Sequence, residues 1–201
     1  MNPDYSDYQQ HDPMRVSIID AARELFSRYG YKKTTMEDIA LVLRKGKSSL
    51  YYYFKNKEDI FQAVLETEEA ILFSRLESVV KSVANPKEKF VRYVNVRMHT
   101  ILELDNYMRT LRDEMYGGYE FIERLKGKSE AKESEFLLSI IKEGLADGSF
   151  SVNNLKMAAT GIAIALRGIE GPLLKANENE GDFQTNLDNI LSIFFYGIIK
   201  R

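Results

Sequence analysis

The sequence predicts an all-α fold. Apolar residues recur at helical spacing through most of the 201 residues, no long run alternates apolar with polar residues, and the chain has only four prolines. Apolar residues make up 44% and charged residues 29% of the chain, as is typical of a globular protein. No apolar run reaches about 18 residues, so no transmembrane helix is expected. The polar, acidic N-terminus is unlike a signal peptide and the chain has no cysteine, so we expect a cytoplasmic protein without disulfides.

Four helices are expected in the first part of the chain. Asp12 followed by Pro13 is a helix-start signal, and Gly30 is typical of the position just after a helix end. Thr35 can cap a second helix, because its side chain can accept a hydrogen bond from the first turn. The expected helices cover residues 13–29, 36–43, 47–54 and 57–84.

Five more helices are expected in the rest of the chain, about nine in total. Asn85 followed by Pro86 is a second strong start signal. Gly117 and Gly118 break a short helix that follows Tyr107. The other expected helices cover residues 86–104, 133–146, 154–175 and 182–199.

Charge is distributed unevenly along the chain. Residues 14–57 carry ten Lys and Arg against four Asp and Glu, a balance of +6, whereas the remaining residues have a balance of −8. A basic block on an acidic body is the pattern expected of a phosphate-binding end. A chance fluctuation in charge remains the alternative on this observation alone.

The segment TTMEDIALVLRKGKSSLYYYFKNKEDIF, preceded by IIDAARELFSRYGYKKT, resembles the DNA-binding signature of the TetR/AcrR family of bacterial transcriptional regulators. The match covers residues 18–65. The resemblance implies an N-terminal three-helix, helix-turn-helix DNA-binding domain and a C-terminal helical domain that binds ligand and dimerises. We expect a disordered tail over residues 1–12, the DNA-binding domain over 13–57 and the regulatory domain over 58–201.

The third helix is the predicted recognition helix, because the second helix of a helix-turn-helix enters the major groove. Leu50 and Phe54 are expected to anchor it to the core. The tyrosines between them could also be core residues, but three consecutive helical positions cover about 300°, so at least one is exposed. In the family, matching positions contact the DNA backbone (Thr35, Tyr51, Tyr53, Lys57) or face the bases (Ser48, Ser49, Tyr52).

The turn before the recognition helix departs from the family pattern. Arg44 stands where the family usually has glycine, and a non-glycine residue in a left-handed turn costs about 1 kcal/mol. Gly46 replaces the usual capping side chain. The substitution adds candidate phosphate contacts at Arg44 and Lys45, beside Lys47, and a turn shifted by one residue remains the alternative register.

The last two long helices are expected to form a homodimer, through Gly161, Ala165, Leu191, Phe194, Phe195 and Ile198. Packing within one chain is the alternative reading of this apolar surface. A lipophilic ligand pocket is expected among Tyr93, Met98, Tyr107, Met108, Leu111, Met115 and Tyr119, because Met and Tyr together suit an adaptable, mostly apolar site. A core without a cavity is the alternative there.

The sequence therefore predicts a DNA-binding transcriptional regulator, released as a repressor from a palindromic operator by a small lipophilic ligand. A DNA-bound adaptor that contacts another protein remains the alternative, and activation remains open. No enzyme, cofactor or metal site is expected, because His11 and His99 are the only histidines and no carboxylate pair stands out.

Overall fold

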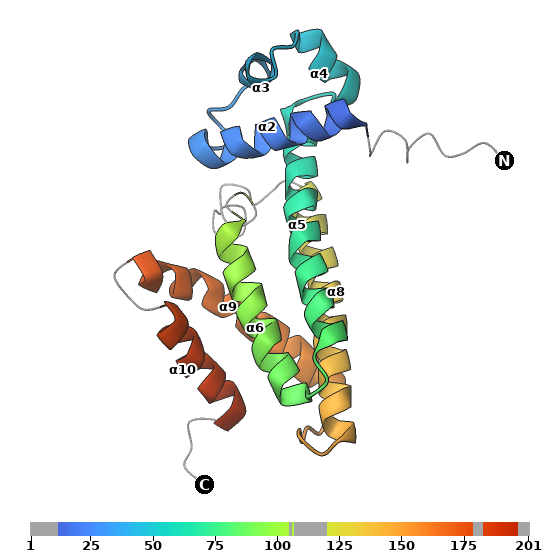
Figure 1. Ribbon diagram of the computed structural model, residues 1–201, viewed down its shortest axis with the longest axis vertical. Coiled ribbons are helices and arrows are strands. Elements are labelled where there is room, and N and C mark those ends of the chain that lie inside the picture. The colour runs from blue at the N-terminus through green and yellow to red at the C-terminus, as the bar shows by residue number, and fades with distance from the viewer. Residues whose placement is uncertain (1–11, 105, 107–119, 179–182, 197–201) are drawn as a thin grey trace, which may run out of the picture. The chain divides into compact units, whose positions relative to one another are not determined.

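The computed structural model describes residues 12–104, 106, 120–178 and 183–196, and all regular structure in these ranges is helical (Figure 1). The predicted fold class is confirmed, with eight helices in the described ranges. The short helix predicted after Tyr107 lies outside them. The helices are α2 (Pro13–Tyr29), α3 (Met36–Val42), α4 (Lys47–Tyr53), α5 (Lys57–Ser82), α6 (Pro86–Glu103), α8 (Glu120–Ala146), α9 (Leu155–Glu178) and α10 (Phe183–Tyr196).

Three helices start at the predicted polar caps. The Asp12 carboxylate accepts a hydrogen bond from the Met14 N–H at the start of α2. Asn56 and Asn85 act in the same way at the starts of α5 and α6, where each side-chain oxygen accepts from the first turn. These bonds satisfy N–H groups that have no partner within their own helix, and they fix where each helix begins.

The chain divides into two compact units. The first contains residues 1–70 and 104–122, and the second contains residues 71–103 and 123–201. The first unit extends past the expected domain boundary at Lys57, because the first turns of α5 supply part of its core. That core is formed by Ile18, Ala22, Phe26, Ile39, Leu50, Phe54, Ile60, Phe61, Val64 and Leu65.

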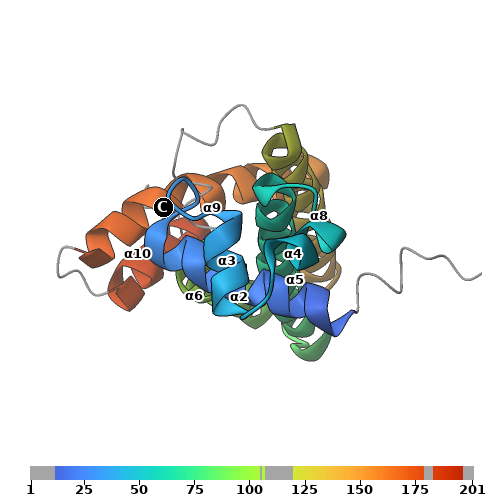
Figure 2. The same cartoon turned by 90° about the horizontal axis from the view of Figure 1, so that it is seen from above.

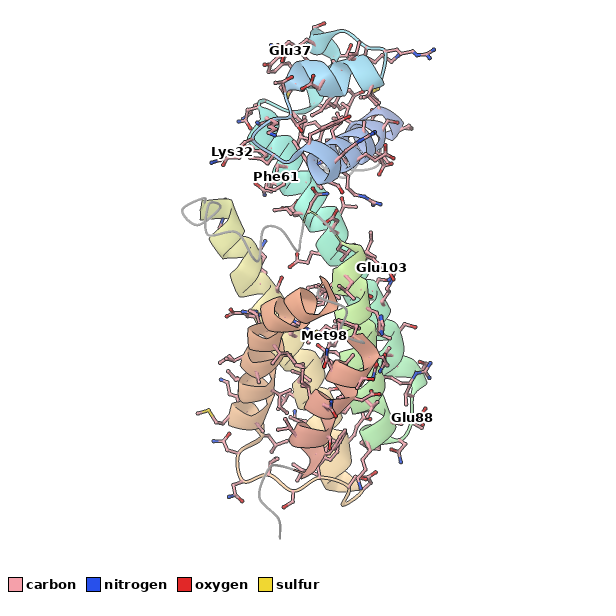
Figure 3. The ribbon with its side chains drawn as sticks, turned by 90° about the vertical axis from the view of Figure 1, so that its left-hand side faces the viewer. Lys32, Glu37, Phe61, Glu88, Met98 and Glu103 are labelled. Atoms are coloured by element: carbon pink, nitrogen blue, oxygen red, sulfur yellow. The ribbon has the colours of Figure 1, made fainter. Side chains whose placement is uncertain are left out.

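In the first unit, α2, α3 and α4 form the trihelical arrangement predicted from the sequence (Figure 2). Helix α3 contacts both α2 and α4. The ring of Phe61 meets Phe26 edge-on, with 5.2 Å between ring centroids, and stacks at a tilt on Tyr31 at 4.6 Å. Figure 3 shows Phe61 and Lys32 close together, where the α2–α3 loop passes α5. This aromatic cluster fixes the loop that leads into α3.

In the second unit, α9 and α10 lie side by side, and α9 also contacts α6 (Figure 1). Helix α8 starts at Glu120, 13 residues before the predicted start at Glu133. The added turns are rich in Glu and Lys, which favour helix without adding to an apolar stripe. The spacing of apolar residues indicates which face of a helix is buried, so it does not reveal a helical segment whose sequence is mostly polar.

Candidate nucleic-acid interface

Thr35 caps α3 in a reciprocal arrangement with Asp38. The Asp38 N–H donates to the Thr35 hydroxyl oxygen at 3.2 Å, and the Thr35 N–H donates to the Asp38 carboxylate at 2.8 Å. The Thr35 hydroxyl itself donates to Asp38 at 2.7 Å, and these bonds hold the pKa of Asp38 below its ordinary value. The capping box makes the start of α3 rigid and leaves Thr35 exposed at its tip.

The turn between α3 and α4 is built around Arg44. Arg44 has a φ of 53°, the only positive φ at a non-glycine residue in the described ranges. The Arg44 N–H donates to the Leu41 carbonyl, and the Lys45 N–H donates to the Ala40 carbonyl, each at 3.0 Å. These two bonds form a Schellman motif, the usual helix ending with a left-handed residue. Gly46 then precedes α4 without a side-chain cap.

Helix α4 turns Leu50 and Phe54 inward and its tyrosines outward, as predicted. Leu50 is fully buried, whereas Tyr52 is 75% exposed and Tyr51 is 46% exposed. Tyr53 is half-buried, and its hydroxyl donates to the Asp12 carboxylate at 3.3 Å. The outer surface of α4 therefore presents two aromatic hydroxyls beside the serines of its first turn.

Five of the predicted DNA-binding residues meet around one shallow hollow of about 390 Å³. It is lined by Met14, Lys45, Ser48, Ser49, Tyr52 and Tyr53. Met14 was not predicted, because its place on α2 gives no sign in the sequence that it approaches α4. A shallow polar surface of this kind can follow a backbone and base edges, but it does not enclose a small molecule.

The cations around this surface differ in how far they are already paired. Lys47 forms an ion pair with Glu37 of α3, which lowers the pKa of the Glu37 carboxyl, and its ammonium also lies 5.6 Å from the Tyr51 ring centroid. Arg44 and Lys45 are exposed, and within the described ranges neither forms an ion pair. Both are therefore candidates to meet phosphate.

Lys57 points into the α2–α3 loop. Its ammonium donates to the carbonyls of Tyr31 at 2.7 Å and Thr34 at 2.9 Å, and it lies 4.3 Å from the Tyr31 ring centroid. Burial lowers the pKa of Lys57. The resemblance implies a phosphate contact at this position. In the structure the ammonium binds carbonyls of the loop just before Thr35, and the phosphate contact stays a prediction.

Of the predicted ligand-binding residues, Tyr93 and Met98 are buried on α6 in the second unit, where Figure 3 labels Met98. The other five, Tyr107, Met108, Leu111, Met115 and Tyr119, lie outside the described residues. The Tyr93 hydroxyl is buried and has no hydrogen-bond partner. Burial raises the pKa of Tyr93, so the phenol stays protonated.

A buried ion cluster surrounds Arg97, one turn from Tyr93. Arg97 donates to both carboxylate oxygens of Glu133, at 2.5 and 3.3 Å, and its guanidinium lies 2.5 Å from a Glu170 carboxylate oxygen. The Glu170 contact is an ion pair without hydrogen-bond alignment. Burial alone would lower the pKa of Arg97, but the two carboxylates raise it. For Glu170, burial raises the pKa, and this effect exceeds the opposite effect of the Arg97 charge.

An arginine of α6 that turns inward could bind a carboxylate ligand. Arg97 does turn inward, but Glu133 and Glu170 already occupy it. Glu170 could have been noticed, because it follows Ala163 and Leu166 on the buried face of α9. Glu133 gave no comparable signal, since it sits in a run of charged residues.

The predicted dimer residues fall into three groups. Gly161 is exposed and Ala165 is half-buried on α9. Leu191 is buried within the chain, and Phe195 meets Phe90 of α6 edge-on at 5.4 Å between ring centroids. The Phe194 side chain and Ile198 lie outside the described parts of the structure.

Comparison with known proteins agrees with this geometry. Residues 18–64 match the family described as bacterial regulatory proteins, tetR family. The chain is 29% identical over 190 residues to the transcriptional regulator QacR of Staphylococcus aureus, covering 93% of this chain and 99% of that protein. It is 28% identical over 141 residues to the repressor KstR2 of Mycolicibacterium smegmatis, covering 68% of this chain and 67% of that one.

The fold is shared with solved structures as well. A TetR/AcrR-family regulator from Thermobifida fusca superposes with a TM-score of 0.78 at 23% identity, over 94% of this chain and all of that one. No described helix is long and apolar enough to cross a membrane. The helix-turn-helix geometry, the matched segment and the full-length relatives agree: residues 18–64 carry the DNA-binding domain of the tetR family, and the chain as a whole is similar to TetR/AcrR-family transcriptional regulators.

Proposed function

We propose that the protein is a homodimeric repressor that inserts α4 into successive major grooves of a palindromic operator and is released by a small lipophilic ligand. The observation that carries the proposal is the outer surface of α4. Tyr51 and Tyr52 are exposed beside Arg44 and Lys45, which have no ion-pair partner within the described ranges. The repressor assignment is supported by relatives that are named as repressors or negative regulators.

Each side chain of this surface has a defined place in the proposal. Ser48, Ser49 and Tyr52 face the bases, where hydroxyls read acceptors and the ring packs on a thymine methyl. Phosphate is bound by Tyr51, Arg44 and Lys45. Lys47 can also bind phosphate if its ammonium leaves the Glu37 carboxylate for a phosphate oxygen. Lys57 contributes by holding the loop that presents Thr35, which is a further phosphate contact.

The test is selection of bound sequences from random duplex DNA, followed by salt titration on the selected operator. Lys45→Gln should weaken binding to all sequences and reduce the slope of log affinity against log salt by about one. Tyr52→Ala should change base preference, by about 1–3 kcal/mol at one position of each half-site. Lys142→Gln, an equal charge change at an exposed site on α8, is the control. If both test variants keep the base preference and the salt slope of the unmodified protein, the proposal that α4 lies in the groove is wrong.

Dimerisation is proposed through the solvent-facing stripe of α9 and the adjoining face of α10. Met157 and Ile164 are 68% and 65% exposed on α9, and Ile193 is 55% exposed on α10. Gly161 lies between the first two on the same stripe and allows close approach of a second helix. A two-fold interface buries such a self-complementary stripe and provides the two recognition helices that a palindrome needs.

Ligand control is proposed to act through the segment that follows α6. Asn106 donates to the Arg23 carbonyl of α2 at 3.1 Å and to the buried Glu68 carboxylate of α5 at 2.9 Å. A ligand that moves this segment therefore disturbs the packing of α2 and α5 within the first unit. It needs to favour the DNA-incompetent state only about 100-fold, or about 2.7 kcal/mol, to weaken operator binding by the same factor.

Thermal stabilisation by a panel of fatty acids, bile acids and hydrophobic cations tests the ligand step, with operator release as the second readout. A compound that stabilises the protein and releases DNA supports it. If no compound does either while operator binding is intact, the protein is better explained as an adaptor that meets a protein partner.

A further inference from the structure

The turn between α8 and α9 folds back on itself and carries Phe150 onto Gly144. Gly148 has a φ of 78°, and the Phe150 N–H donates to the Gly144 carbonyl at 2.8 Å. A Cβ at Gly144 would lie 2.1 Å from the Phe150 ring, so no other residue fits without displacing it. Glycine inside a helix costs about 0.5–1 kcal/mol, and this contact accounts for it.

Phe150 forms one wall of a cavity of about 310 Å³ in the second unit. The cavity is lined by Lys87, Phe90, Ile141, Ser149, Phe150, Ser151, Val152, Ile162 and Phe195. It shares no residue with the predicted ligand set around Tyr93. Its volume is that of about ten water molecules, at the lower end of the range for small-molecule sites.

The lining is apolar apart from Lys87 and two serines. The rings of Phe150 and Phe195 both meet Phe90 edge-on, with centroids 6.5 and 5.4 Å from it. Edge-on aromatic walls favour a flat or narrow apolar guest. The polar groups are the two serines of the turn and the Lys87 ammonium, all at the start of α6 or in the turn.

Lys87 supplies the charge among these polar groups. Lys89, two residues on, is already paired with Glu143. Asp147 feels the charge of Lys87, but its carboxylate is held by Ser149, and the Ser149 hydrogen bonds lower the pKa of Asp147. Asp147 does not line the cavity, and Lys87 does. Among the described residues that line the cavity, Lys87 is the one charged side chain, so the charge available to a guest is positive.

We propose that this cavity binds a small amphipathic monoanion, with its apolar body between the phenyl rings and its carboxylate toward Lys87. The apolar walls supply most of the affinity, because they remove the guest's hydrocarbon from water. Lys87 and the serine hydroxyls orient the guest and select the acid over its neutral and cationic analogues. Binding here does not depend on the role of α4 or on operator release.

The experiment is calorimetric titration of the full chain with phenylbutyrate, phenylbutanol and phenylbutylamine. These probes share one apolar body and differ in charge. Phenylbutyrate should bind once per chain and more tightly than the other two. Lys87→Gln should weaken the acid about fivefold, as expected for a partly exposed ion pair, and leave the alcohol unchanged. Lys142→Gln, the control of equal charge change, should alter neither.

Filling the cavity tests its location. Val152→Trp, in the turn, should abolish binding of all three probes while circular dichroism and the thermal melt stay close to those of the unmodified protein. If Val152→Trp does not fold, Ile162→Phe fills the same space from α9. Binding that survives either folded variant, absence of binding by the acid, or an amine that binds as tightly as the acid overturns the proposal.

Discussion

Arg44 in its left-handed conformation provides a sharp test of the turn that positions the recognition helix. The perturbation is a pair of substitutions, Arg44→Ala and Arg44→Gly. Both remove the guanidinium, so any difference between them comes from the backbone. The Schellman hydrogen bonds involve only main-chain atoms and are available to both variants.

The expected difference follows from the φ of 53°. The left-handed backbone conformation costs an L-residue with a Cβ about 1–2 kcal/mol of conformational energy, and it costs glycine almost nothing. Glycine in turn loses about 0.5–1 kcal/mol more conformational entropy on folding than alanine does. Arg44→Gly should therefore be more stable than Arg44→Ala by about 0.5–1 kcal/mol.

Chemical denaturation measures this difference, and operator titration against salt measures the lost charge. Both variants should reduce the salt slope by about one, equally, because both lose the same phosphate contact. A glycine variant that is no more stable than the alanine variant would refute the strained turn. If the salt slopes of both variants instead match that of the unmodified protein, Arg44 does not contact DNA phosphate. That result would not bear on the strained turn.

Three further predictions concern the second unit. Arg97→Met should lower the free energy of unfolding by about 3–5 kcal/mol in a denaturant titration, because it removes the buried cation that two buried carboxylates share and leaves only the more distant Arg167 near them. Joint replacement of Arg97, Glu133 and Glu170 by apolar residues should recover most of the loss. Glu170→Gln should stabilise the protein near neutral pH. Burial raises the pKa of Glu170, so at pH values above its ordinary pKa of 4.5 the folded protein is less stable than it would be with a neutral side chain. The stabilisation by Glu170→Gln should therefore shrink as the pH falls toward 4.5, which a series of thermal melts measures. Ile164→Glu should convert the proposed dimer to a monomer in light scattering, whereas Val16→Glu, at an exposed apolar position on α2, should not.

The bounds of α2, α3, α4 and α5 could be predicted from sequence to within two residues, because their signals are local. Asp12, Thr35 and Asn56 cap helices by reaching only two or three residues along the chain. The period of Leu50 and Phe54 likewise separates the inner from the outer face of α4. Local signals of this kind survive without knowledge of the tertiary fold.

The rest depends on contacts between distant parts of the sequence. Lys57 was expected to meet phosphate, and only the folded loop shows the carbonyls of Tyr31 and Thr34 converging on its ammonium. The pairing of Arg97 with Glu133 and Glu170 joins three helices, and nothing in the spacing of those residues indicates it. The cavity beside Phe150 depends on how the chain reverses between α8 and α9. The spacing of apolar residues does not show where that turn places Phe150.

The Arg97 cluster also bears on how the second unit folds. Its members come from α6, α8 and α9, and Arg97 and Glu133 are 36 residues apart in sequence. Arg97 is the cation that both carboxylates share, so docking α8 against α9 without α6 would bury Glu133 and Glu170 with their common cation missing. The same loss follows when α6 docks one turn out of register, because Arg97 then no longer meets the two carboxylates. The cluster therefore favours a packing of α8 and α9 that includes α6 in its native register.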